Sequence, residues 1–247
     1  MQAKEMTEVE HVEQLAHYVK ELDLDKFTET PSGRRFGDYF SFKKGAPQDI
    51  VREYKDYWNT DYVARMTHPQ ASYLTQLLAK EYKVPIEVRS VDTAMEVHNV
   101  EKDAKERIQG WEHNREVILK LEDSLWVIPH PKVVSEEGKL VYDINGSIRN
   151  IVNVVRGRQK VEASEQNIDG GVKAEGDNVF DVLRNAGVLR EHKVKTTGGG
   201  MYFDDSNYKG IASVGSYSYG GLFYAGADWP SIRDVLGLAR SELLEKE

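Results

Sequence analysis

The chain has 247 residues, of which 40% are hydrophobic and 30% are charged, and its net charge is -8. This composition is that of a soluble globular protein with a core of ordinary size, and it excludes a largely disordered chain. The acidic balance argues against non-specific binding to nucleic acid or to an anionic membrane, although it leaves room for a local basic groove. The absence of cysteine excludes disulfides, thiolate metal sites and a cysteine nucleophile.

The N-terminal residues are charged from the start, so we expect no signal peptide. The longest apolar runs are much shorter than a membrane-spanning segment, so we expect no membrane partner. These features predict a cytoplasmic or otherwise intracellular protein, and a location inside a virion is compatible with them.

Capping signals and apolar periodicity predict the elements of the first hundred residues. Thr7 with Glu10 and Thr67 with Gln70 have the spacing of capping boxes, and Pro47 suits the first turn of a helix. The predicted elements are, in chain order, a helix over 7–24, a strand over 35–43, helices beginning at 47 and 67, a strand over 84–88, and a second strand that includes Met95 and Val97.

The longest predicted helix covers residues 101–122. One face of this segment is charged, as on a solvated helix, and the apolar residues recur near helical spacing. These apolar residues are Ala104, Ile108, Trp111, Ile118 and Leu121. We expect Trp111 to be at least partly buried on this helix.

Turn and glycine signals organise the remainder of the chain. The predicted elements are a strand over 124–128, a hairpin with its loop at 135–138 and its return strand over 140–144, a helix over 148–157, an exposed loop over 158–177, a short helix over 178–187, a strand over 188–195, and a last helix capped by Asp228.

Helices and strands are interspersed without a regular βα alternation, which favours an α+β fold over a doubly wound sheet. We therefore predict mixed helices and short antiparallel strands, with Gly/aromatic-rich strands near the C-terminus. The predicted organisation is a helix-rich α+β region over 1–157, an exposed loop or boundary over 158–177, and a smaller α+β region over 178–247.

A glycine- and aromatic-rich stretch over 198–229 contains eight glycines and seven Tyr or Phe residues. Glycine permits close approach of strands, and aromatics supply large packing surfaces. Four large aromatics so close together do not easily fit inside one small core, and an exposed aromatic patch is unusual on a soluble monomer. We therefore predict that Tyr217, Tyr219, Phe223 and Tyr224 lie on strands and contact a partner subunit or a ligand.

The trio Asp181, Glu191 and Lys193 resembles the D…ExK pattern of the PD-(D/E)xK nucleases. In that family two carboxylates hold a divalent metal such as Mg²⁺, and the lysine positions or activates water. Asp181 departs from the pattern because it lies inside a predicted helix, and a capped helix followed by a solvated strand explains the same residues. None of the seven histidines forms an HExxH pair, and we predict no other metal site.

The helix at 178–186 and the strand at 188–195 also resemble the end of a winged-helix domain, which implies that nearby basic residues contact phosphates. Acidic residues interleave with the basic ones there, so a mixed-sign surface is the simpler interpretation.

Two functional hypotheses follow. The first is a non-enzymatic structural or assembly protein that forms a homo-oligomer or part of a larger particle, for example a viral one. It depends on the lack of a catalytic signature and on the glycine- and aromatic-rich stretch, which suits self-association. The alternative is a metal-dependent nucleic-acid-processing enzyme, a nuclease that uses Asp181, Glu191 and Lys193 with Mg²⁺.

Overall fold

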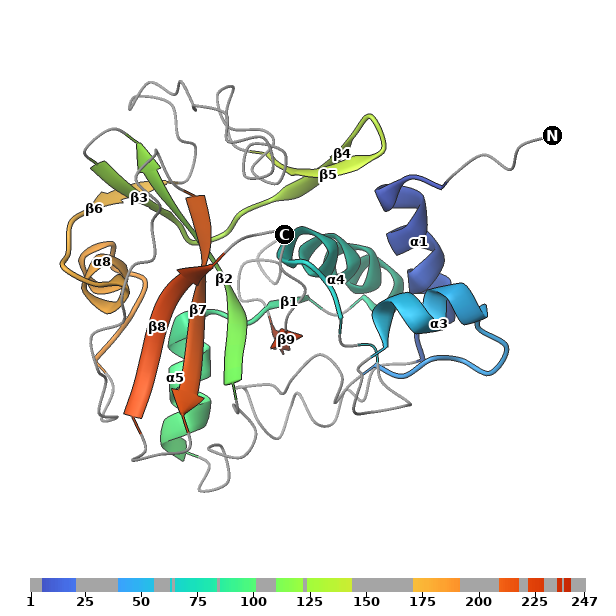
Figure 1. Cartoon of the computed structure of the whole chain (residues 1–247), viewed down its shortest axis with the longest axis horizontal. Helices are drawn as coiled ribbons and strands as arrows, with labels where there is room; N and C mark the ends of the chain where they lie inside the picture. Colours follow the sequence, from blue (N-terminus) through green and yellow to red (C-terminus); the bar gives the residue numbers. More distant parts are fainter. Residues whose placement is uncertain are drawn as a thin grey trace.

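The computed structural model describes residues 6–20, 40–55, 63, 65–83, 85–100, 110–121, 124–143, 171–191, 209–217, 222–228, 235–236 and 238–240. The helices are α1 (Glu8–Tyr18), α3 (Gln48–Tyr54), α4 (His68–Tyr82), α5 (Val91–Val100) and α8 (Val179–Asn185). The strands are β1 (Ile86–Val88), β2 (Gly110–Leu121), β3 (Ser124–Ile128), β4 (Val133–Glu136), β5 (Lys139–Tyr142), β6 (Val172–Ala174), β7 (Lys209–Tyr217), β8 (Leu222–Asp228), β9 (Val235–Leu236) and β10 (Leu238–Arg240). Together they form an α+β fold, as the sequence predicts (Figure 1). Within these residues, no helix combines the length and the apolar character needed to cross a membrane.

The central sheet has the strand order β6-β3-β2-β7-β8, and each neighbouring pair is antiparallel. β9 pairs in parallel with β2 at residues 112–113, a stretch that β3 does not reach. β1 pairs with β10, and β4 with β5, in two smaller sheets. The central sheet thus joins strands from before and after the segment 158–177, of which residues 171–177 are described and include β6. The proposed division of the chain at that segment stays a prediction.

Two hydrophobic cores lie on opposite faces of the central sheet. Val117 and Ile128 are register partners, and both belong to the core that includes α1, α3 and α4. The next pair along the strands, Ile118 and Val127, belongs to the core that includes α5 and α8. Successive residues of a strand point to opposite faces, so buried neighbours in sequence mean that this part of the sheet is covered on both sides. Figure 1 shows α1, α3 and α4 grouped on one side of the sheet.

The helices α1 and α4 run side by side in the same direction. Near their starts, Nε2 of Gln70 donates to Oε1 of Glu8 at 3.3 Å, and near their ends the Tyr82 hydroxyl donates to the carbonyl of Lys20 at 3.1 Å. Both predicted capping boxes are present. The prediction that the first helix extends to residue 24 is wrong, because the backbone becomes extended at Val19, which bridges to the segment around residue 42.

The predicted hairpin is confirmed as β4 and β5. Its turn residues Glu137 and Gly138 have φ values of 49° and 79°, and two positive φ values are typical of a tight two-residue hairpin turn. The hairpin is tied to the helices, because the carbonyl of Gly138 accepts the N–H of Val9 at 3.3 Å. Farther along, Nδ1 of His68 lies 2.5 Å from the Tyr142 hydroxyl, and both side chains are fully buried. This burial raises the pKa of Tyr142 well above its ordinary value.

The predicted helix over 101–122 is wrong in its described part, because Gly110–Leu121 form the long strand β2. Apolar residues at 111, 118 and 121 recur near helical spacing, whereas burial on both faces removes the period-two alternation that identifies a half-buried strand. Residues 101–109, the side chain of Trp111 and the predicted helix over 148–157 lie outside what the structure describes.

Three further predictions of local structure are wrong. Met95 and Val97 lie in α5 rather than in a strand, and this helix begins where Oγ of Ser90 accepts the N–H of Thr93 at 3.0 Å. Residues 188–191 have no regular structure, and 192–195 lie outside the described residues. The predicted last helix is replaced by β9 and β10, because pairing with the distant strands β2 and β1 overrides local periodicity.

Candidate functional site

Asp181 lies on α8, as the sequence predicts, and its carboxylate is engaged within that helix. Nδ2 of Asn178, the N-cap residue, donates to Oδ2 of Asp181 at 2.6 Å, and Nη1 of Arg184 lies 3.5 Å from Oδ1. In return, the backbone N–H of Asp181 donates to Oδ1 of Asn178 at 3.1 Å. Asp181 therefore completes a helix cap, in which its negative charge also suits the positive end of the helix.

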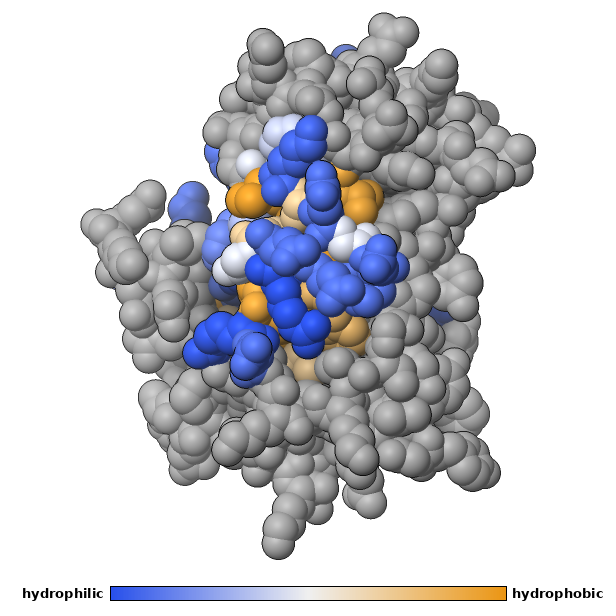
Figure 2. All heavy atoms as spheres, turned by 90° about the vertical axis from the view of Figure 1, so that its left-hand side faces the viewer, coloured by the Kyte–Doolittle hydropathy of each residue, from blue (hydrophilic) through white to orange (hydrophobic). Residues whose placement is uncertain are grey.

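The other two members of the nuclease trio are not brought to Asp181 by any described contact. Glu191 is exposed in a segment without regular structure, and Lys193 lies outside the described residues. Figure 2 shows mainly hydrophilic residues over the described part of the side that carries α8. Among the described residues, no three histidine or acidic side chains are grouped so that they could hold a metal ion.

The nuclease interpretation stays a hypothesis with a direct test. It predicts that Glu191→Gln abolishes Mg²⁺-dependent cleavage of DNA while the thermal melt stays unchanged, because Glu191 is exposed. If the wild-type protein cuts neither DNA nor RNA with Mg²⁺ or Mn²⁺, the hypothesis is removed.

The glycine- and aromatic-rich stretch forms β7 and β8. Tyr217 is the last residue of β7, and Phe223 and Tyr224 lie on β8, which pairs antiparallel with β7 along its whole length. Tyr219 lies outside the described residues. The contacts of these four aromatics with a partner stay a prediction.

The two edges of the central sheet differ. β6 has three residues, and its middle residue is the exposed Lys173. A short edge strand with a lysine resists pairing with another chain. β8 has seven residues, contains neither lysine nor proline, and has Asp228 as its single charged residue. Within the described part of the chain it pairs with β7 alone, so it presents the longer and less protected row of backbone donors and acceptors.

A bulge in β2 carries polar residues that sequence reasoning did not single out. The ladder between β2 and β7 shifts register between 113 and 117. Within this shift, the N–H of Arg115 donates to the carbonyl of Arg89 at 2.9 Å, and Oε2 of Glu116 accepts the N–H of Val91 at 3.0 Å. Val91 is the first residue of α5, so these two hydrogen bonds hold the connection between β1 and α5 against the sheet. Bulges commonly re-aim side chains in this way.

Four side chains at the bulge form a network that we call the buried charge network: Glu87, Arg115, Glu116 and His130. Arg115 forms an ion pair with Glu87, and its Nη2 lies 3.8 Å from Oε1 of Glu116. Oε2 of Glu87 lies 3.8 Å from Nδ1 of His130. The side-chain exposure falls from 38% at His130 through 21% and 17% at Glu87 and Arg115 to 0% at Glu116. The network therefore leads from the surface to the core.

Burial raises the pKa of Glu116, while Arg115 and the N–H of Val91 act in the opposite direction. The carboxylate lies at the start of α5, where the helix dipole favours a negative charge. Its contacts therefore support a role in positioning α5 on β2. The signal available in the sequence was the polar run over 112–116, which precedes an apolar run within one strand.

Comparison of the chain with protein-family models, with curated proteins and with solved structures gives no match.

Proposed function

We propose that the protein is a structural or assembly protein whose copies associate through the edge strand β8. The observation that supports this proposal is the difference between the two edges of the central sheet. β6 is short and carries Lys173, whereas β8 is seven residues long and contains neither lysine nor proline. Although α8 contacts β8, α8 packs in the same core as Ile118 and Val127, on a face of the sheet.

Two β8 strands can pair antiparallel about a two-fold axis, because each strand then offers the other the same row of donors and acceptors. Such pairing makes one continuous sheet across two copies and closes as a dimer. If β8 instead pairs with a different surface of the next copy, the contact repeats and builds a larger particle, such as a viral one. The mass in solution distinguishes the two arrangements.

The aromatic residues near this edge add contact area in the proposal. Aromatic side chains are enriched at the centres of interfaces, where they supply much of the binding energy. We expect the double substitution Tyr217→Ser and Tyr219→Ser to weaken assembly more than it lowers the melting temperature of the subunit. If the double variant unfolds, yet its folded fraction assembles normally, these tyrosines are core residues and the aromatic contact is wrong.

The decisive experiment measures the mass of the full chain by light scattering and by sedimentation over a range of concentrations. Proline removes one backbone donor, and adjacent residues of a strand direct their N–H groups to opposite sides. Ala225 and Gly226 are adjacent on β8, so the N–H of one faces β7 and the N–H of the other faces the open edge. Of the variants Ala225→Pro and Gly226→Pro, one therefore removes a donor from the open edge and leaves the hydrogen bonds between β7 and β8 intact. The thermal melt identifies that variant. Val172→Pro and Lys173→Pro are the matched controls on β6.

We expect an oligomeric wild type, a folded monomer for the outward β8 variant, and an unchanged mass for whichever β6 variant stays folded. A wild type that is monomeric at every concentration contradicts the proposal. Loss of the oligomer in the folded β6 variant moves the interface to the other edge.

A further inference from the structure

The C-terminal ends of α1 and α4 meet at one end of the helical layer. The Tyr82 hydroxyl donates to the carbonyl of Lys20 at 3.1 Å, which joins the end of α4 to the second residue after α1. The segment after Phe40 lies against the same place, because the N–H of Lys20 donates to the carbonyl of Ser41 and the N–H of Lys43 donates to the carbonyl of Tyr18, each at 2.7 Å. Three segments, 17–20, 41–45 and 80–83, are thus brought together, and we call them the basic end.

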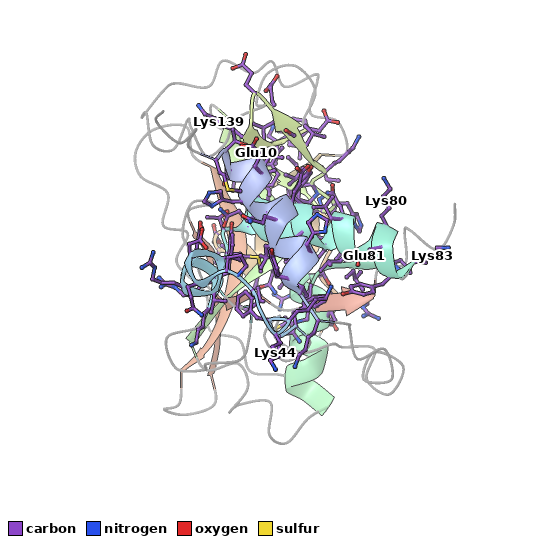
Figure 3. All side chains as sticks on the ribbon, turned by 90° about the vertical axis from the view of Figure 1, so that its right-hand side faces the viewer. Glu10, Lys44, Lys80, Glu81, Lys83 and Lys139 are labelled. Atoms are coloured by element: carbon purple, nitrogen blue, oxygen red, sulfur yellow. The ribbon has the colours of Figure 1, made fainter. Side chains whose placement is uncertain are left out.

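Lysines dominate the exposed side chains of the basic end: Lys20, Lys43, Lys44, Lys80 and Lys83. Glu81 is the single acidic residue in the three segments. The basic end therefore carries a charge of +4 in a chain whose total is -8, so the remainder of the chain carries -12. In Figure 3, Lys44, Lys80 and Lys83 extend outward around the ends of the helices, while the labelled Lys139 and Glu10 lie at the opposite end.

These lysines are not neutralised within the described part of the chain. None of the five forms an ion pair with a described residue; Lys43 donates through Nζ to the carbonyl of His17 at 3.0 Å. A cation near a helix C-terminus stabilises the helix, which accounts for Lys80 in the last turn of α4. Lys44 lies in a turn outside any helix, so helix stabilisation does not account for the whole cluster.

We propose that the basic end binds the phosphate backbone of a nucleic acid. A lysine ammonium is a compact charge that contacts phosphate without reading bases, so a cluster made of lysines predicts binding without sequence preference. An anionic membrane also attracts lysines, but stable binding to its surface adds apolar groups that insert beside the charges. Among the residues whose side chains the structure describes, the exposed large hydrophobic ones are Met6 and Val172, and neither belongs to the basic end.

The expected signature is a strong salt dependence. Each lysine–phosphate contact releases a counterion from a duplex, so five contacts give a slope of log K against log salt of about -4.5. The binding constant should therefore fall by about two orders of magnitude or more between about 50 and 200 mM salt. The proposal concerns a surface on the helical layer and does not depend on association through β8.

The test measures binding of the full chain to a short fluorescent DNA duplex by anisotropy, over the same range of salt. The variant replaces Lys44, Lys80 and Lys83 with glutamine, and the control replaces three exposed lysines outside the basic end, which gives an equal change in net charge. The control residues are Lys132, Lys139 and Lys173. All six side chains are exposed, and the thermal melt confirms that both variants are folded.

We expect the variant of the basic end to lose at least tenfold in affinity at low salt and to lower the salt slope by about 2–3, because three counterion-releasing contacts are removed. The control should change affinity by less than about threefold, since its lysines act only through the long-range field. Equal losses in both variants, or a wild type that binds neither DNA nor RNA at low salt, overturn the proposal. Binding to phosphatidylserine vesicles without binding to the duplex overturns it in favour of a membrane surface.

Discussion

Replacing Glu116 tests how the buried charge network stabilises the fold. Its Oε2 accepts the N–H of Val91 at 3.0 Å, and its side chain is fully buried. Glu116→Ala leaves that N–H without its acceptor, which costs about 1–3 kcal/mol, and also leaves a small cavity. We therefore expect Glu116→Ala to lower the free energy of unfolding by about 2–4 kcal/mol at neutral pH.

Glu116→Gln keeps a carbonyl oxygen for the N–H of Val91 and removes the charge. Burial raises the pKa of Glu116, so its surroundings disfavour the ionised form despite Arg115, whose Nη2 lies 3.8 Å away. The glutamine variant should therefore lie within about 1 kcal/mol of the wild type at neutral pH.

The raised pKa of Glu116 also predicts how the stability difference between the wild type and Glu116→Gln changes with pH. A carboxyl whose pKa is higher in the folded state than in the unfolded state stabilises the fold below the unfolded pKa, and this contribution is lost as pH rises through the folded pKa. The stability of the glutamine variant relative to the wild type should thus rise with pH, starting from the ordinary pKa of glutamate.

Urea unfolding of the wild type and of Glu116→Gln, between mildly acidic and neutral pH, measures this difference in stability. Titratable groups that the two proteins share affect both stabilities alike, so their contributions to the difference largely cancel. If Glu116→Gln costs as much as Glu116→Ala at neutral pH, the attraction to Arg115 outweighs burial and the reasoning is wrong. A difference that does not change with pH would show that the ionisation of Glu116 is not linked to folding.

Two further predictions concern packing and the hairpin turn. Val117→Ala and Ile118→Ala should each destabilise the protein, by about 1–3 and 2–5 kcal/mol, because the two neighbours fill different cores; a negligible cost for either would contradict a sheet covered on both faces. In urea unfolding, Gly138→Ala should lower the free energy of unfolding more than Gly45→Ala does. Both glycines have positive φ, so the backbone strain is present in both variants. A Cβ on Gly138 would also lie 2.6 Å from Cγ2 of Thr7, whereas a Cβ on Gly45 would have nothing within 4 Å. Equal costs would mean that the hairpin moves away from α1 without penalty.

The parts of the fold that the sequence predicts correctly depend on contacts between near neighbours. The capping boxes at Thr7 and Thr67 join residues three positions apart, and the hairpin turn at Glu137 and Gly138 joins adjacent strands. The cap of α8 by Asn178 is equally local. In each case the residues that specify the structure lie within one turn of one another, so a single sequence contains the necessary information.

The parts that the sequence does not predict depend on distant partners. β2 has no clear alternation because Val117 and Ile118 are both buried, in cores built from different helices. The apolar residues after 228 recur at helical spacing, which predicts a helix. In the structure β9 and β10 instead pair with β2 and β1, more than a hundred residues earlier in the chain. The buried charge network likewise joins Glu87 and His130 to the bulge of β2, and no spacing in the sequence marks that meeting.

The difference between local contacts and contacts with distant segments also matters for the proposed assembly. Composition alone predicts strands in the glycine- and aromatic-rich stretch, but whether a strand lies at an edge is a property of the sheet order. Association through β8 would use backbone N–H and C=O groups, which every strand possesses, and it would require an edge without lysine or proline, as β8 is. A function of this kind needs no set of specific residues at fixed spacing. An assembly protein of this kind is therefore expected to lack a catalytic motif. The measurement that tests the proposed assembly is the sedimentation of the β8 variants, rather than a search for a motif.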